Sequence, residues 1–190
     1  MQSRRPLLVV VSGAPASGKT TLATRLAGDL RLLFVGKDAL KEAICDAIGP
    51  PADVAASMRA GSAAYSAAFT LTRETLAAGD GVVLESNFRR GLSEAELAPV
   101  AALGDARLIH CMASHGVVAS RYRERNAAGL RHPAHRDDER VSDLALDLES
   151  GRFEPLQLGI PTMVVATDDD LSPQYDAILE FAGRGNGASR

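Results

Sequence analysis

The chain has 190 residues, of which 46% are hydrophobic and 24% are charged, and its formal net charge is −3 at neutral pH. This length and composition are typical of one globular domain that needs no disulfide or structural metal to fold. The negative net charge makes nucleic acid an unexpected partner, because nucleic-acid-binding domains are usually basic. No apolar run approaches the ~20 residues that a membrane span needs.

The two cysteines, Cys45 and Cys111, lie in apolar sequence and fit reduced, buried thiols. The apolar run after Arg4 and Arg5 is shorter than the apolar region of a secretory signal, which takes about 7–15 residues. We therefore expect a cytoplasmic protein that does not contact a membrane.

Short apolar runs alternate with stretches of helical periodicity, which predicts a parallel sheet covered by helices. The fold class is therefore α/β, a three-layer α/β/α domain with a five-stranded parallel sheet. We expect a single domain over residues 1–184 and a disordered tail over residues 185–190. A ligand should lie at the carboxyl ends of the strands. The predicted strands are residues 7–11, 32–35, 82–84, 107–112 and 162–166.

The helices between these strands carry their own signals. Ser93 and Glu96 have the spacing of a capping box for one of them. A long helical pattern in the first half of the chain is open to interruption at Gly61. Helices are predicted to start near residues 20, 38, 54, 93, 116, 137 and 172.

The most specific motif lies between the first predicted strand and the first helix. It has the pattern G-x-x-x-x-G-K-[ST] of a phosphate-binding loop, in the strand–turn–helix context that such a loop requires. Backbone N–H groups and the positive end of the helix would bind the phosphates of ATP. Lys19 would reach the β- and γ-phosphates, and the Thr20 hydroxyl would bind Mg²⁺. The predicted nucleotide-binding residues are Gly13, Ala14, Pro15, Ala16, Ser17, Gly18, Lys19, Thr20 and Thr21.

Acidic residues follow the second and third strands, at the edge of the sheet where this loop lies. Asp38 suits a group that orients or deprotonates an acceptor hydroxyl, although it also fits the N-cap of its helix. Glu85 either contributes to the Mg²⁺ site or is a charged residue at a strand exit. Asn87 and Arg89, which come next, are candidates for substrate binding.

A basic segment after the fourth strand is the candidate for a lid, over about residues 114–136. Arg121 and Arg125 are four residues apart and therefore share a helix face. A guanidinium group delivered from this face can neutralise charge on a transferred phosphoryl group. The alternative is a solvated helix in which these charges pair with Glu124.

The irregular loop beyond this segment contains Arg131 and His132, which are candidates for substrate contact. His132 and His135 also have the spacing of a metal pair. No cysteine or other third ligand lies nearby at a zinc-like spacing, so a lid surface or a substrate contact is the preferred interpretation.

On these residues the whole chain resembles the small phosphate-loop kinases grouped with chloramphenicol phosphotransferase, gluconate kinase, the kinase domain of polynucleotide kinase, and zeta toxin. The phosphate-binding loop carries most of the resemblance. Residues 35–40 are similar to the segment in which the family has its acceptor base, and this implies that role for Asp38. The lid and the closing segment of the family resemble residues 121–131, 153–156 and 164–167.

The resemblance implies that the loop at Thr167 lies against the adenine, because the family's closing loop does so. Glu85 stands where relatives often have aspartate, which leaves its role at the metal open. The segment 87–90 matches no member of the group, so the resemblance does not choose the acceptor.

We therefore predict an ATP- and Mg²⁺-dependent kinase that transfers the γ-phosphate to a hydroxyl group of a small molecule, a metabolite or an antibiotic, and that is a monomer or homodimer. One alternative is a kinase for polynucleotide ends or nucleotide sugars. Only 4% of residues are aromatic, which argues against a stacking groove for nucleic acid. Another alternative is a nucleotide-switched regulator, but no N-K-x-D or T-K-x-D motif of a GTPase occurs.

Overall fold

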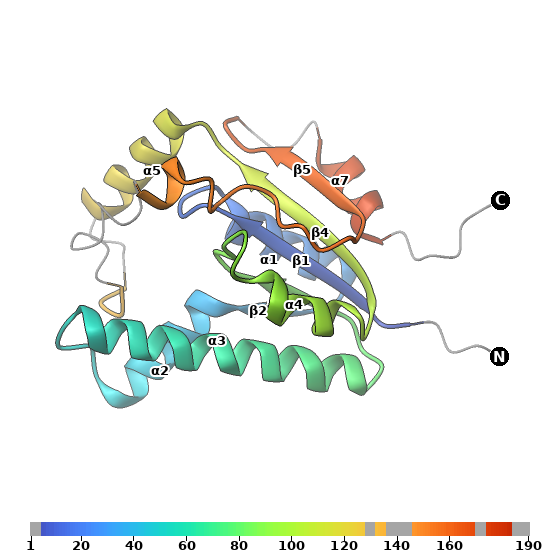
Figure 1. Cartoon of the computed structure of the whole chain (residues 1–190), viewed down its shortest axis with the longest axis horizontal. Coiled ribbons are helices and arrows are strands. Elements are labelled where there is room, and N and C mark those ends of the chain that lie inside the picture. The colour runs from blue at the N-terminus through green and yellow to red at the C-terminus, as the bar shows by residue number, and fades with distance from the viewer. Residues whose placement is uncertain (1–4, 128–131, 136–145, 170–173, 184–190) are drawn as a thin grey trace.

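The computed structural model describes residues 5–127, 132–135, 146–169 and 174–183 (Figure 1). Its strands pair in parallel throughout, in the order β2-β3-β1-β4-β5. This confirms the predicted five-stranded parallel sheet. The strands are β1 (Leu7–Gly13), β2 (Leu33–Gly36), β3 (Val82–Glu85), β4 (Asp105–Met112) and β5 (Thr162–Ala166).

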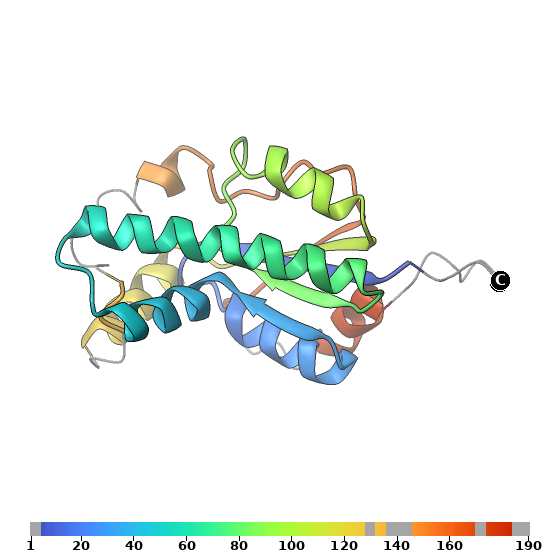
Figure 2. The same cartoon turned by 90° about the horizontal axis from the view of Figure 1, so that it is seen from below.

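Helices cover both faces of the sheet (Figure 2). The long helix α3 and the short helix α4 pack on one face, and α1 and α7 pack on the other. The domain is therefore the predicted three-layer α/β/α arrangement. The helices are α1 (Lys19–Leu30), α2 (Lys37–Ile48), α3 (Val54–Ala77), α4 (Glu94–Ala101), α5 (His115–Ala127) and α7 (Tyr175–Gly183).

The central strand β1 is buried on both faces, which makes it easy to predict from the sequence. Leu8 and Val10 point into the core beneath α3 and α4, whereas Val9 and Val11 point into the core beneath α1 and α7. All four side chains are fully buried. A strand buried on both faces must be apolar at every position, and the sequence of β1 shows such a continuous run.

The structure decides one helix signal that the sequence left open and contradicts another. Helix α3 continues through Gly61 without a break, because its apolar face is held against the sheet. Ser93 precedes α4 but does not cap it. Its hydroxyl instead accepts a hydrogen bond from the backbone N–H of Arg89 at 2.9 Å, so the predicted capping box with Glu96 does not form.

Strand β4 begins two residues earlier than predicted, because a charged pair is buried at its start. The Arg107 guanidinium donates to both carboxylate oxygens of Asp105, at 2.6 and 3.2 Å. The predicted helix starts near residues 137 and 172 and the tail over residues 185–190 lie outside the described residues. Within the part of the chain that the structure describes, no helix is long and apolar enough to cross a membrane.

Candidate active site

The phosphate-binding motif forms the turn between β1 and α1. The backbone turns through left-handed conformations at Ala16 (φ 62°) and Gly18 (φ 78°). Ala16 is one of two non-glycine residues with positive φ among the described residues, and a strained backbone of this kind is typical of functional sites. A Cβ atom at Gly13 would lie 2.4 Å from the carbonyl oxygen of Cys111, so only glycine fits there.

The amino end of α1 is open for an anion. Gly18 is its N-cap, and no side chain caps the helix. The first N–H groups of a helix lack intrahelical partners, and the helix dipole adds positive potential at this end. The hydroxyl of Ser17, also in the loop, is buried and has no hydrogen-bond partner among the described residues. These features fit the phosphate groups of a nucleotide.

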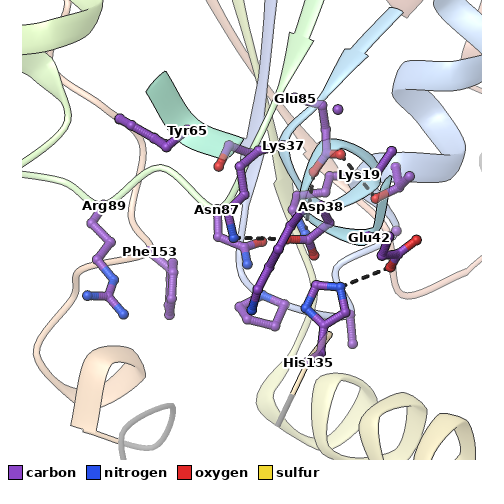
Figure 3. A pocket seen from close by; sticks show the side chains of 18 of the residues that line it. Lys19, Lys37, Asp38, Glu42, Tyr65, Glu85, Asn87, Arg89, His135 and Phe153 are labelled. Atoms are coloured by element: carbon purple, nitrogen blue, oxygen red, sulfur yellow. Dashed lines mark hydrogen bonds and ion pairs between the residues drawn. The ribbon is translucent and has the colours of Figure 1, made fainter. Parts of the chain in front are cut away.

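The buried side chains of Lys19 and Glu85 lie next to each other at the end of this loop (Figure 3), and the exposed Thr20 contacts the same carboxylate. Lys19 Nζ lies 3.7 Å from Glu85 Oε1, and the Thr20 hydroxyl donates to Glu85 Oε2 at 3.3 Å. These contacts form because β1 and β3 are neighbours, with Val11 paired in register with Glu85. A hydroxyl and a carboxylate are hard oxygen donors, so Thr20 and Glu85 fit a Mg²⁺ site.

The electrostatics of Glu85 agree with a cation site. Burial raises the pKa of its carboxyl group, and the negative charge of Asp38 raises it further, while Lys19 and the Thr20 hydroxyl lower it. A buried carboxylate that is costly to ionise gains most from a nearby cation.

Asp38 lines the same cleft as the phosphate-binding loop, near Lys19 and Glu85 (Figure 3). It is the second residue of α2, whose N-cap is Gly36, so Asp38 is not itself the N-cap. The pairing of Gly36 with Glu85 across β2 and β3 brings the start of α2 close to Glu85. Lys37 Nζ lies 3.1 Å from Asp38 Oδ1.

Arg121 approaches the loop from α5. Its guanidinium donates to the backbone carbonyl oxygens of Thr167 at 2.7 Å and Asp168 at 3.2 Å. It also passes 3.9 Å from the position that a Cβ atom would take on Gly18. Arg121 lines the cleft, whereas Thr167 is buried and does not line it. The side chain of Arg125 is not described.

The predicted substrate residues separate into two groups. Asn87 and Arg89 line the cleft, and the buried Oδ1 atom of Asn87 has no partner among the described residues. Arg89 pairs with Asp147 at 2.7 Å, and the same carboxylate also lies 3.7 Å from Arg152. His132 lies outside the cleft lining and pairs with Asp46 at 3.0 Å. Arg131 lies outside the described residues.

The structure separates the two histidines of the predicted pair, and it adds two aromatic residues to the cleft lining that the sequence did not indicate. His135 enters the cleft and pairs with Glu42 at 2.9 Å, whereas its neighbour in the predicted pair, His132, does not enter. Tyr65 from α3 and Phe153 line the side away from the phosphate-binding loop (Figure 3). No sequence signal distinguishes these two aromatic residues from core residues. No cluster of three or more potential metal-binding side chains occurs among the described histidines, cysteines and acids.

The cleft has a volume of about 680 Å³ and runs from the phosphate-binding loop to Tyr65, Arg89 and Phe153. This volume lies within the range of about 300–1,000 Å³ for small-molecule sites. One end presents anion-binding and metal-binding groups, and the other presents aromatic and polar side chains. The fold and the loop together define a P-loop nucleotide-binding protein.

Comparison with known proteins agrees with this class. A family model described as an AAA domain matches residues 8–156, and the chain belongs to this family. A solved structure from Chloroflexus aurantiacus J-10-fl, provisionally named a kinase, is 34% identical with a TM-score of 0.82. That match covers 94% of this chain and 99% of the other. A comparison with curated proteins found no match.

Two more distant structures share the fold. A gluconokinase from Sinorhizobium meliloti 1021 is 22% identical with a TM-score of 0.56, over 95% of this chain and 94% of the other. The APS kinase CysC of Mycobacterium tuberculosis, solved with AMPPNP and APS, is 15% identical with a TM-score of 0.57, over 95% and 99%. The predicted resemblance to small P-loop kinases is confirmed, and the matches support phosphotransferase chemistry.

Proposed function

We propose that the protein is an ATP- and Mg²⁺-dependent kinase that transfers the γ-phosphate of ATP to a hydroxyl group of a small molecule. The observation that carries this proposal is the position of Asp38. Its carboxylate faces Lys19, Thr20 and Glu85 and is close enough to raise the pKa of Glu85. A carboxylate beside a phosphate site, on the wall of an open cleft, fits a group that acts on the acceptor.

In this reaction the acceptor oxygen forms a bond to the γ-phosphorus while the bond from that phosphorus to the β–γ bridging oxygen breaks. Asp38 orients the hydroxyl and takes its proton, and ADP leaves. Such a transfer passes through a loose transition state, so positioning matters more than strong basicity. Mg²⁺, held near Thr20 and Glu85, would supply charge neutralisation at the β- and γ-oxygens.

Two cations of the chain have roles in the same step. Lys19 belongs to the phosphate-binding loop, and its Nζ atom lies 3.5 Å from the carbonyl oxygen of Ala14 in the same loop. From this position its ammonium group can reach the phosphates of ATP. Arg121 reaches the opposite side of the loop, next to Gly18. In this position its guanidinium can neutralise charge that develops on the transferred phosphoryl group.

The proposal is tested by ADP formation from ATP and Mg²⁺ across a panel of hydroxylated metabolites, antibiotics, nucleotide sugars and oligonucleotides. Lys19→Ala should abolish turnover. Asp38→Asn should lower acceptor-dependent kcat by about 100-fold or more, because a positioned base contributes about 10²–10⁴-fold. Asp46→Asn is the matched control, since Asp46 lies on the same helix but outside the cleft. Full acceptor-dependent activity in Asp38→Asn would contradict the role of Asp38.

A further inference from the structure

The distribution of lysine in this chain is unusual. The sequence contains three lysines, Lys19, Lys37 and Lys41, against eighteen arginines. All three line the cleft. Lys19 belongs to the phosphate-binding loop, and the buried Lys41 donates a hydrogen bond to the Ser57 hydroxyl at 2.7 Å. Lys37 has no part in the function as proposed so far.

The side chain of Lys37 turns toward its neighbour in the sequence. Lys37 is the first residue of α2, and its Nζ atom lies 3.1 Å from Asp38 Oδ1. Consecutive residues of a helix point in different directions, so they do not normally face each other. The contact therefore requires the lysine side chain to bend across the start of α2. Both side chains are partly buried, at 21% and 29% exposure.

Gly61 of α3 provides the space for this path. A Cβ atom at Gly61 would lie 3.7 Å from Lys37 Nζ and 3.9 Å from Lys41 Cε. A methyl group would fit at these distances, but a longer side chain would occupy the volume that the two lysines fill. A residue no larger than alanine at this point of α3 therefore leaves the passage for lysine open.

The charges around Asp38 show what Lys37 contributes. Asp38 lies near the carboxylate of Glu85 and faces the site proposed for the ATP phosphates. Both would repel the Asp38 carboxylate from the position at which it meets an acceptor. An ammonium group at 3.1 Å offsets this repulsion and fixes one carboxylate oxygen. Lysine suits the narrow space over Gly61 because its charge is compact, whereas a guanidinium is broad and planar.

We propose that Lys37 is a positioning residue for phosphoryl transfer: it holds the Asp38 carboxylate toward the acceptor, along a path that Gly61 keeps open. This inference rests on the proposed function, because it assigns to Lys37 an effect that acts through Asp38. It makes Lys37 and Asp38 one functional unit.

Kinetics of Lys37→Met and Lys37→Arg test this role. We expect Lys37→Met to lower acceptor-saturated kcat by about 10-fold to 100-fold, since a misplacement of about 1 Å can cost about 100-fold. The KM for ATP should stay unchanged, and Lys37→Arg should recover part of the loss. Lys37→Met should add nothing to Asp38→Asn in the double variant. Effects of the two substitutions that multiply, or a Lys37→Met enzyme with wild-type kcat, would overturn the role.

Gly61 offers a second, independent pair of variants. Gly61→Ala should keep wild-type kcat, because its methyl group makes only ordinary contacts with Lys37. Gly61→Leu should lower kcat to the level of Lys37→Met, because its side chain displaces the lysine. Thermal unfolding of each variant shows whether it is folded. A folded Gly61→Leu protein with wild-type kcat would overturn the proposed path.

A spectroscopic experiment tests the contact without any turnover. Protein grown with lysine labelled with ¹³C at Cε should give three signals, which Lys37→Arg and Lys41→Arg assign. Asp38→Asn should shift the Lys37 signal, and Asp46→Asn should not. An unmoved Lys37 signal overturns the inference. If the Lys37 signal shifts but the protein turns over no acceptor, the proposed function is overturned and the contact stands. If the enzyme is active and Lys37→Met does not change its turnover, only the positioning role is overturned.

Discussion

The Thr167 hydroxyl donates a hydrogen bond to the backbone carbonyl oxygen of Ser17 at 2.7 Å, across 150 positions of the sequence. The carbonyl oxygen of Thr167 accepts from the Arg121 guanidinium, also at 2.7 Å. One buried residue after β5 thus joins the phosphate-binding loop to α5. This link sets the distance between the loop and the arginine that approaches it.

Removal of the Thr167 hydroxyl should weaken nucleotide binding. Thr167→Val keeps the shape of the side chain but leaves the Ser17 carbonyl without this donor. A hydrogen bond of this kind contributes about 0.5–1.5 kcal/mol, so we expect the Kd for ATP to rise by about 2-fold to 12-fold. Isothermal titration calorimetry with ATP and Mg²⁺ measures the change. Thr167→Ser retains the hydroxyl and should bind as wild type; equal affinity of the valine variant would show that the link is dispensable.

Substitution of Glu85 should change the requirement for Mg²⁺. Glu85→Gln keeps the size of the side chain but removes the charge beside Thr20. Loss of a group that supports a metal site typically costs about 10-fold to 100-fold in metal affinity. We therefore expect the Mg²⁺ concentration for half-maximal ADP formation to rise by at least about 10-fold. Glu74→Gln, on the exposed side of α3, is the control. An unchanged Mg²⁺ curve would remove Glu85 from the metal site.

The buried pair at the start of β4 should contribute strongly to stability. Asp105 and Arg107 are 9% and 4% exposed, and two hydrogen bonds join them. Asp105→Asn removes the negative charge that the buried Arg107 guanidinium contacts through two hydrogen bonds, and breaking a buried ion pair typically costs about 3–5 kcal/mol. Urea denaturation should show a loss of this size in the free energy of unfolding. The double variant Asp105→Asn with Arg107→Met should recover part of it, and a loss below about 1 kcal/mol in the single variant would contradict this account.

The sequence predicted the fold and the phosphate-binding loop well because both depend on local signals. A continuous apolar run such as residues 7–11 predicts a doubly buried strand wherever it occurs. The motif at residues 13–20 combines fixed residue types with fixed spacing, which requires no knowledge of distant parts of the chain. The strand ends then placed Asp38 and Glu85 at one edge of the sheet.

The rest of the site depends on contacts that no local pattern encodes. The path of Lys37 over Gly61 exists only because α3 packs against α2, and local propensity alone left a break at that glycine open. The sequence predicted that Arg89 binds substrate, but in the structure its guanidinium group pairs with Asp147. The Ser93 hydroxyl was predicted to cap α4, but it accepts a hydrogen bond from the backbone N–H of Arg89 instead. In each case tertiary packing determined which of two contacts forms, and the local sequence did not distinguish between them.

One buried histidine should make the stability of the protein depend on pH. His110 lies in β4 and is 2% exposed, and its Nδ1 atom has no partner among the described residues. Burial lowers its pKa below the ordinary 6.5, although a hydrogen bond to the backbone of Phe153 and the charge of Glu154 oppose this. The folded protein therefore favours the neutral imidazole.

The lower pKa of His110 in the folded state sets the direction in which the free energy of unfolding changes with pH. Below pH 6.5 the unfolded chain takes up a proton that His110 in the folded state does not bind, so the free energy of unfolding falls as the pH falls through this window. The slope contributed by one such group is at most about 1.4 kcal/mol per pH unit. Urea denaturation between pH 8 and pH 5 should show this decline in the wild type and in His132→Gln, and a flatter profile in His110→Gln. An equally steep decline in His110→Gln would assign the pH dependence to other groups.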